Sequence, residues 1–128
     1  VLMVGFFQHP FYPYSGTDHP ASNMLNLPIP AYTKGMDVRE LIEAAWIPRL
    51  EEFGPEMIFV SAGFDAHRED DLGQLGLTEN DFAWITSRIQ DVARRHSRGR
   101  IVSMLEGGYN LDALARSVEA HIRVLADL

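Results

Sequence analysis

The chain has 128 residues, of which 46% are hydrophobic and 23% are charged, a composition typical of one globular domain. The net charge of −7 at pH 7 argues against DNA or RNA as a direct partner, because phosphate binding requires a basic surface. The chain lacks cysteine, which excludes disulfides and thiolate zinc sites, and no apolar run reaches the roughly 20 residues of a membrane helix, so we expect a cytoplasmic protein without a membrane partner.

The chain opens with an apolar segment. Residues 1–7 are β-prone, which predicts a buried strand. Because the sequence starts inside this strand and without methionine, we expect a fragment whose upstream portion is missing. Residues 8–36 contain five prolines, so we expect a long loop there and neither a helix nor a central strand.

The next predicted element is a helix that ends at Phe53. Apolar residues recur at helical spacing after Asp37, whose carboxylate can cap the first turn. We expect Pro48 to kink or shorten this helix, and Gly54 to end it.

Two further strands and helices follow in alternation. Residues 57–60 predict a second buried strand, and residues 61–77 predict a loop. Thr78 and Asp81 have the spacing of a capping box, which predicts a helix that continues to about Ser97.

The last elements complete a regular pattern. Residues 101–105 predict a third strand, residues 106–110 a tight loop, and Asn110 can cap a final helix that reaches Leu125. Alternating strands and helices predict an α/β fold, in which a mostly parallel sheet has helices on both faces as a three-layer structure. We expect residues 1–128 to belong to one domain.

Polar residues follow each predicted strand, at residues 8–10, 63–67 and 106–109. Ligands of parallel sheets bind beyond the carboxyl ends of the strands, so these three loops are expected to meet at one edge. Asp65 comes directly after a buried strand, where an ionised carboxylate needs a cation, a metal or several hydrogen-bond donors. The alternative interpretation is a turn-forming Asp that binds N–H groups of its own loop.

The loop 106–110 contains the sequence Gly107-Gly108-Tyr109. The glycines allow a close approach of the backbone, and the tyrosine O–H could donate to a developing oxyanion. The alternative is a turn whose tyrosine ring packs on the core. The chain has neither of the glycine-rich phosphate-binding motifs, which disfavours a nucleotide-binding domain.

Two neighbours of Asp65 remain open to interpretation. His67 could share a metal with Asp65, because alternate residues of an extended segment point the same way. An exposed, hydrogen-bonded histidine is an equally good interpretation. The acidic run at residues 69–71 is interpreted as a solvated surface in which Asp70 could hold the shape of the loop.

Several segments together resemble the zinc-dependent histone deacetylase family. They are SAGFDAH at 61–67, LGLT at 75–78, DF at 81–82, LEGGYNL at 105–111 and FQHPFYPYSG at 7–16. The similarity is greatest to the class II-like branch, with the bacterial deacetylase-like amidohydrolases and the acetylpolyamine amidohydrolases. The resemblance implies that residues 1–128 are the C-terminal portion of one α/β catalytic domain, and it suggests a bacterial source.

The resemblance also implies roles for individual residues. Asp65 matches a zinc ligand, and Tyr109 matches the tyrosine that polarises the substrate carbonyl. Gly107 and Gly108 match glycines near the floor of the substrate tunnel. Tyr12 matches an aromatic wall of the acyl-lysine tunnel, and Leu72 an apolar residue near its rim.

Metal binding and activity are implied in the same way. The backbone near Phe7 and Gln8 matches a region close to the structural potassium sites of the family. The other two zinc ligands and the paired histidines that act as base and acid lie upstream in the family, so we expect the chain alone to be inactive. The implied reaction is hydrolysis of N-acetyl amides of acetyl-lysine peptides or acetylpolyamines. The alternative is a non-catalytic binding or oligomerisation module, such as a homo-oligomer formed through exposed sheet edges.

Overall fold

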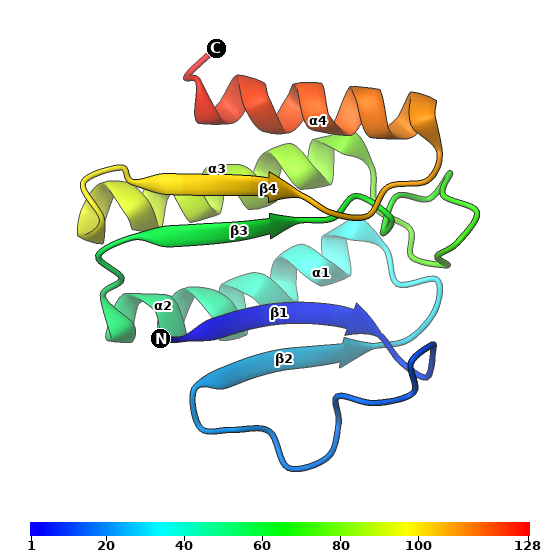
Figure 1. The fold of residues 1–128 in the computed structure, drawn as a ribbon, viewed down its shortest axis with the longest axis horizontal. Coiled ribbons are helices and arrows are strands. Elements are labelled where there is room, and N and C mark those ends of the chain that lie inside the picture. The colour runs from blue at the N-terminus through cyan, green and yellow to red at the C-terminus, as the bar shows by residue number, and fades with distance from the viewer.

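The computed structural model describes residues 1–128 and contains four parallel strands and a layer of helices. The elements in chain order are β1 (Met3–Gln8), β2 (Met24–Ile29), α1 (Gly35–Leu41), the π-helical turn η1 (Ile42–Trp46), α2 (Ile47–Phe53), β3 (Ile58–Ala62), α3 (Glu79–His96), β4 (Ile101–Leu105) and α4 (Leu111–Leu125). All four strands point the same way, so their carboxyl ends share one edge of the molecule (Figure 1). The predicted α/β class with parallel strands is confirmed.

The prediction that residues 8–36 form one long loop is wrong, although the segment contains no central strand. Strand β2 lies in this segment and pairs in parallel with β1, from Met3 opposite Met24 to Gln8 opposite Ile29. β2 is an edge strand that includes Pro28. The carbonyl of Ile29 accepts from the His9 N–H, so the backbone groups of Ile29 face β1. Backbone groups of successive residues point to opposite sides of a strand, so those of Pro28 face away from β1. The N–H that proline lacks therefore costs no hydrogen bond of the ladder.

The first helical segment differs from its prediction at two points. It begins at Gly35 rather than after Asp37, and Asp37 lies in its first turn, where a carboxylate favours the positive end of the helix dipole. Before Pro48 the chain forms the wider π-helical turn η1. A proline ring clashes with the carbonyl one turn earlier in a regular α-helix, and the wider turn relieves this clash. Gly54 ends the segment in a left-handed conformation, as predicted.

The caps of the last two helices agree with the sequence. Thr78 and Asp81 form the capping box of α3, with the Thr78 N–H donating to Asp81 Oδ2 at 2.9 Å. At the start of α4, the Ala113 N–H donates to Asn110 Oδ1 at 3.0 Å. These side chains satisfy N–H groups that a helix start leaves without partners.

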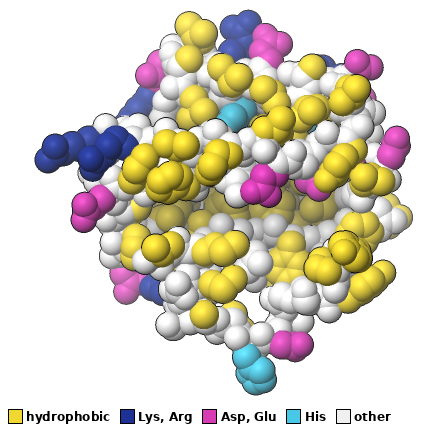
Figure 2. Space-filling view, in the orientation of Figure 1, with side chains coloured by type: hydrophobic (Ala, Val, Ile, Leu, Met, Phe, Trp, Pro, Cys, Tyr) yellow, Lys and Arg dark blue, Asp and Glu magenta, His cyan; other side chains and the backbone are white.

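The strands form two separate pairs, β1–β2 and β3–β4, rather than one continuous sheet. The N–H groups of Met3 and His9 point toward the β2 side, and the Ile58 N–H points toward the β4 side. The N–H and C=O groups of the other residues in β1 and β3 therefore point toward the space between these two strands, where they form no ladder of hydrogen bonds. Figure 2 shows a hollow with an apolar floor across the middle of this face.

The helices lie along one side of the strands. In Figure 1, α1, α2 and α3 lie behind them, and α4 packs on α3. The other face of β3–β4 is open, with Phe59, Val102 and Met104 exposed. The expected helices on this second face are therefore not among the elements of these 128 residues.

The loop between β3 and α3 is packed into the hydrophobic core. Phe64 and Leu77 are buried in it, and the Phe64 ring lies edge-to-face with Phe82 at 5.1 Å between centroids. Burying side chains of this size contributes about 2–3 kcal/mol each. The core thus fixes both ends of the loop that carries Asp65.

Candidate active site

The loops that follow β3 and β4 are joined at the carboxyl edge. The Phe64 N–H donates to the carbonyl of Gly107 at 2.7 Å, and the Glu106 N–H donates to the carbonyl of Ala62 at 2.9 Å. A Cβ atom at Gly107 would lie 2.8 Å from Cγ of Asp65. Only a glycine fits beneath the carboxyl group at this distance, so the structure brings Asp65 and the Gly107–Tyr109 segment together.

The carboxyl group of Asp65 lies in an environment that disfavours its charge. Although the residue is exposed, partial burial of the carboxyl group raises its pKa, against a lowering by its own backbone N–H, and the charges of Asp70 and Glu106 raise it further. The bond from its own backbone N–H is of the kind that the turn-forming interpretation expects, and no other N–H of the loop donates to this carboxyl group. A cation beside this group would stabilise the ionised form.

Tyr109 lies on the other loop with its ring turned away from the core. The side chain is 56% exposed, and its hydroxyl makes no hydrogen bond within the chain. Gly108 before it has φ of 144°, a conformation that side chains disfavour, and a Cβ there would lie 2.6 Å from Leu114. The interpretation of Tyr109 as a core-packing residue therefore does not hold.

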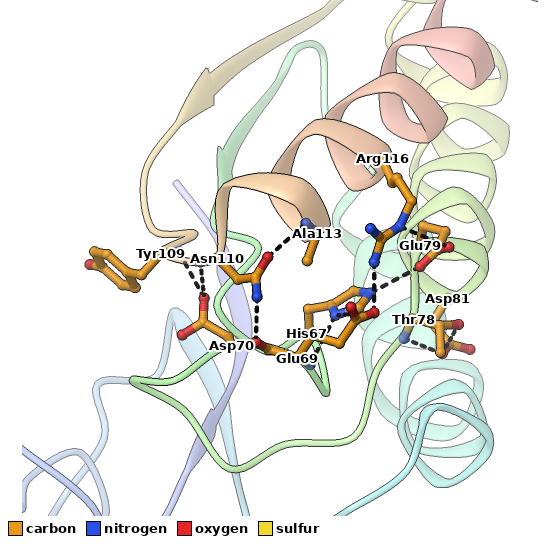
Figure 3. Close-up of polar contacts among 10 residues, drawn as sticks. All are labelled: His67, Glu69, Asp70, Thr78, Glu79, Asp81, Tyr109, Asn110, Ala113 and Arg116. Carbon is orange, nitrogen blue, oxygen red and sulfur yellow. Dashed lines mark hydrogen bonds and ion pairs between the residues drawn. The ribbon is translucent and has the colours of Figure 1, made fainter.

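Asp70 connects the two loops, a role that the acidic run at residues 69–71 only partly suggested. Its side chain is buried, with 7% of the residue exposed, so it does not belong to a solvated surface. Oδ1 accepts from the Leu72 N–H at 2.8 Å, and Oδ2 accepts from the Tyr109 N–H at 2.7 Å (Figure 3). The Asn110 N–H lies 3.4 Å from the same Oδ2 atom.

His67 is a support of the loop, and the interpretation of an exposed histidine is wrong. It is 1% exposed; its Nδ1 accepts from the Glu69 N–H at 3.1 Å, so Nε2 carries the proton that it donates to Glu79 at 2.9 Å. Arg116 pairs with Glu69 and Glu79 above it (Figure 3). Both ring nitrogens are occupied, which leaves His67 no free atom for a metal shared with Asp65.

The two remaining predicted substrate residues lie on exposed loops. Tyr12, after β1, is 80% exposed, and Leu72 is exposed beside Asp70. A contact between Gln8 and Gln74, which was not predicted, joins these loops: Gln8 Nε2 donates to Gln74 Oε1 at 2.9 Å, and the Gln74 N–H donates to Gln8 Oε1 at 3.0 Å. Their separation of 66 residues left no local signal of this contact.

The donor set of these residues does not by itself make a zinc site. No group of three or more His, Cys, Asp or Glu side chains is placed to hold a metal ion. A catalytic zinc ion has three protein ligands, and among the predicted site residues Asp65 is the one carboxylate. The residues of this chain alone therefore do not complete such a site.

Comparisons with known proteins place the chain in one family. The family model described as the histone deacetylase domain matches residues 1–125. Type-2 histone deacetylase 1 of Dictyostelium discoideum is 38% identical over 105 residues, which is 82% of this chain and 7% of that protein. The probable deacetylase of Archaeoglobus fulgidus is 33% identical over 118 residues, which is 88% of this chain and 33% of that protein.

Solved structures give the same answer for the fold. The crystal structure of the HDA15 HD domain matches with a TM-score of 0.89 and 28% identity, over 98% of this chain and 38% of that one. The histone deacetylase Clr3 matches with a TM-score of 0.85 and 25% identity, over 99% of this chain and 27% of that one. The chain thus spans well under half of the proteins it matches.

Relatives occur in Dictyostelium discoideum, Oryza sativa, Archaeoglobus fulgidus and Synechocystis, so they do not single out the bacterial source suggested above. None of the helices has the length and apolarity required to span a membrane. The match over residues 1–125, together with the two structural alignments, shows that the chain belongs to the histone deacetylase family.

Proposed function

We propose that this chain is the C-terminal part of a zinc-dependent deacetylase domain that hydrolyses N-acetyl amides of acetyl-lysine peptides or acetylpolyamines. The observation that carries the proposal is the meeting of the Asp65 carboxyl group with the Gly107–Tyr109 segment at the carboxyl edge of the strands. The relatives named as deacetylases support this reaction class.

Each residue has a defined task in this proposal. Tyr109 donates its free O–H to the carbonyl oxygen as negative charge develops on it, and Gly107 and Gly108 leave room for the carboxylate of Asp65 and the substrate. Tyr12 and Leu72 flank the acyl-lysine chain with exposed apolar surface. Zinc, when bound by Asp65 with ligands from outside this chain, supplies a Lewis acid and an activated water.

The raised pKa of Asp65 fits a metal ligand. Burial of the carboxyl group, opposed by its own backbone N–H and reinforced by the charges of Asp70 and Glu106, raises its pKa, and a cation beside it would offset this effect. With one ligand of three, the 128-residue chain should have no deacetylase activity and should not retain zinc through dialysis.

The test uses the complete deacetylase domain that contains these residues, with an acetyl-lysine peptide and an acetylpolyamine as substrates. Tyr109→Phe should lower kcat about 10²–10³-fold and leave zinc content unchanged, because it removes one oxyanion donor. Asp65→Ala should lose both zinc and activity. Tyr14→Phe, at another exposed tyrosine, is the matched control and should behave as the parent protein. Full activity of Tyr109→Phe would refute the proposal.

A second candidate function is a binding or oligomerisation module. The facing edges of β1 and β3 lack ladder hydrogen bonds, and Phe59 is 64% exposed on the open sheet face. Unpaired strand edges and exposed apolar surface promote association. Light scattering on the 128-residue chain tests this candidate: it predicts a defined oligomer that Phe59→Ser weakens, whereas a monomer at high concentration would refute it.

A further inference from the structure

We infer that Asp70 is a positioning residue that holds Tyr109 in its place relative to the loop of Asp65. The inference deepens the proposed function and rests on it, because it assigns the device that orients the oxyanion donor. It stands on three hydrogen bonds to one buried carboxylate, whose partners lie on two loops 37 or more residues apart.

The two oxygens of Asp70 divide their partners between the loops. Oδ1 accepts from Leu72 in its own loop at 2.8 Å, and Oδ2 accepts from Tyr109 at 2.7 Å. A carboxylate is a rigid planar group, and hydrogen bonds from N–H donors to it are stronger than those between neutral groups. One side chain therefore links the Leu72 and Tyr109 backbones. Figure 3 shows the Asp70 carboxylate bound to the backbone of Tyr109 and Asn110.

Asp70 is the side chain that binds the backbone of Tyr109 itself, while the other bonds between the two loops are made by its neighbours Gly107 and Asn110. The Tyr109 ring is exposed and its hydroxyl has no partner, so neither packing nor a hydrogen bond to the side chain orients it. Gly108 on one side has no side chain that could anchor the segment. On the other side Asn110 begins α4, and its Nδ2 donates to the carbonyl of Glu69 at 2.9 Å, which adds a second tie to the residue next to Asp70.

Replacing the carboxylate with an amide selectively weakens this link. Asp70→Asn has nearly the same shape, but its single oxygen can serve only one of the two loops, and its NH₂ group opposes the N–H of the other. Asp71→Asn removes the same charge from the adjacent residue. Asp71 is exposed and makes no hydrogen bond or ion pair within the chain, which makes it the matched control.

The first experiment is a double-mutant cycle in the complete deacetylase domain. Asp70→Asn should lower kcat about tenfold or more, with KM within about twofold and zinc content unchanged, since a displaced donor fails mainly in the transition state. In a Tyr109→Phe background the same substitution should lower kcat less than about twofold, because no O–H is left to position. Asp71→Asn should match the parent protein.

Two results of the cycle would overturn the inference. Fully additive losses would show that Asp70 acts independently of Tyr109, and loss of zinc in Asp70→Asn would show a general effect on the loop of Asp65. A fully active Tyr109→Phe protein would instead refute the proposed function, and the second experiment then decides the inference alone.

The second experiment measures amide hydrogen exchange in the complete deacetylase domain and needs no activity. Exchange at the Tyr109 amide should become about tenfold faster in Asp70→Asn, as expected for losing a hydrogen bond to a charged acceptor. The amides of Phe64 and Val92, in the core, should keep their rates, and Asp71→Asn should change none. Unchanged exchange at Tyr109, or faster exchange at all three amides, would overturn the inference.

Discussion

The two sides of the carboxyl edge are built differently. On the β3–β4 side, the loops of Asp65 and Tyr109 are joined by main-chain hydrogen bonds at Gly107 and by the buried carboxylate of Asp70. On the β1 side, the loop that carries Tyr12 is exposed, and its tie to the rest of the edge is the exposed Gln8–Gln74 pair.

This difference separates two kinds of work. A group that stabilises a transition state must be held within a fraction of an ångström, and buried, charge-assisted hydrogen bonds provide this restraint. A wall that accepts a flexible acyl chain tolerates more movement, and exposed neutral hydrogen bonds suffice for it. The predictions below test whether the β3–β4 side is as sensitive, and the β1 side as tolerant, as this comparison requires.

The largest effect is expected at Gly107. A Cβ atom there would lie 2.8 Å from Oδ2 of Asp65, so Gly107→Ala must displace the carboxylate and should lower activity of the complete domain about 10²-fold, with reduced zinc content. At Gly63 the nearest contact of a Cβ atom is 3.3 Å, also to Asp65, so Gly63→Ala is the matched comparison and should be milder. Equal losses in the two variants would contradict this placement of Asp65.

The next effect is on stability. His67 is buried and bonded to Glu79 and to the Glu69 N–H, so His67→Ala leaves a cavity and unpaired polar groups, and it should lower the free energy of unfolding of the chain by about 2–4 kcal/mol. Urea unfolding followed by circular dichroism measures this. His19→Ala, at an exposed histidine, should change it by less than about 0.5 kcal/mol. A small effect at His67 would mean that the loop does not depend on it.

A smaller effect concerns pH. The hydrogen bond from His67 holds the pKa of Glu79 below its ordinary value of 4.5, with its own backbone N–H and Arg116 acting in the same direction. A carboxyl group whose pKa is lower in the folded chain stabilises the fold fully at pH values above its pKa in the unfolded chain. This stabilisation is lost as the pH falls through the pKa of the folded chain. Thermal melts between pH 7 and pH 3 should show a shallower acid loss for Glu79→Gln than for the parent chain; parallel curves would exclude this linkage.

The smallest effect is expected on the β1 side. Gln74→Ala removes exposed hydrogen bonds to Gln8, so it should cost about 0.5–1 kcal/mol in stability and leave kcat and zinc content of the complete domain unchanged. KM for the acyl substrate should rise, because the loop of Tyr12 loses a tie. A loss of kcat as large as that of Asp70→Asn would remove the distinction between the two sides.

Much of the local structure was readable from residues close together in the chain. Alternating strands and helices indicated the α/β class, and Thr78, Asn110 and Gly54 marked helix ends correctly. The polar segments after β3 and β4 also pointed to a shared edge, because parallel strands place their carboxyl ends together.

Other features depended on partners distant in sequence. Strand β2 was obscured by Pro28, which an edge position accommodates, and an edge position is a property of the whole sheet. Asp70 stands in an acidic run that looks solvated until its bond to the Tyr109 N–H, 39 residues away, is known. His67 seemed suited to an exposed position or a metal until Glu79 and the core enclosed it.

The sequence by itself determined the alternation of strands and helices after β2, the caps of the last two helices and the family, because these follow from side chains acting within a few residues and from motifs at fixed spacing. Only the tertiary structure decided that the strands form two pairs, that one face stays open and that Asp70 joins two loops. The reason is physical: whether a carboxylate can be buried, and whether a strand edge is paired, depends on partners that the fold brings from far along the chain.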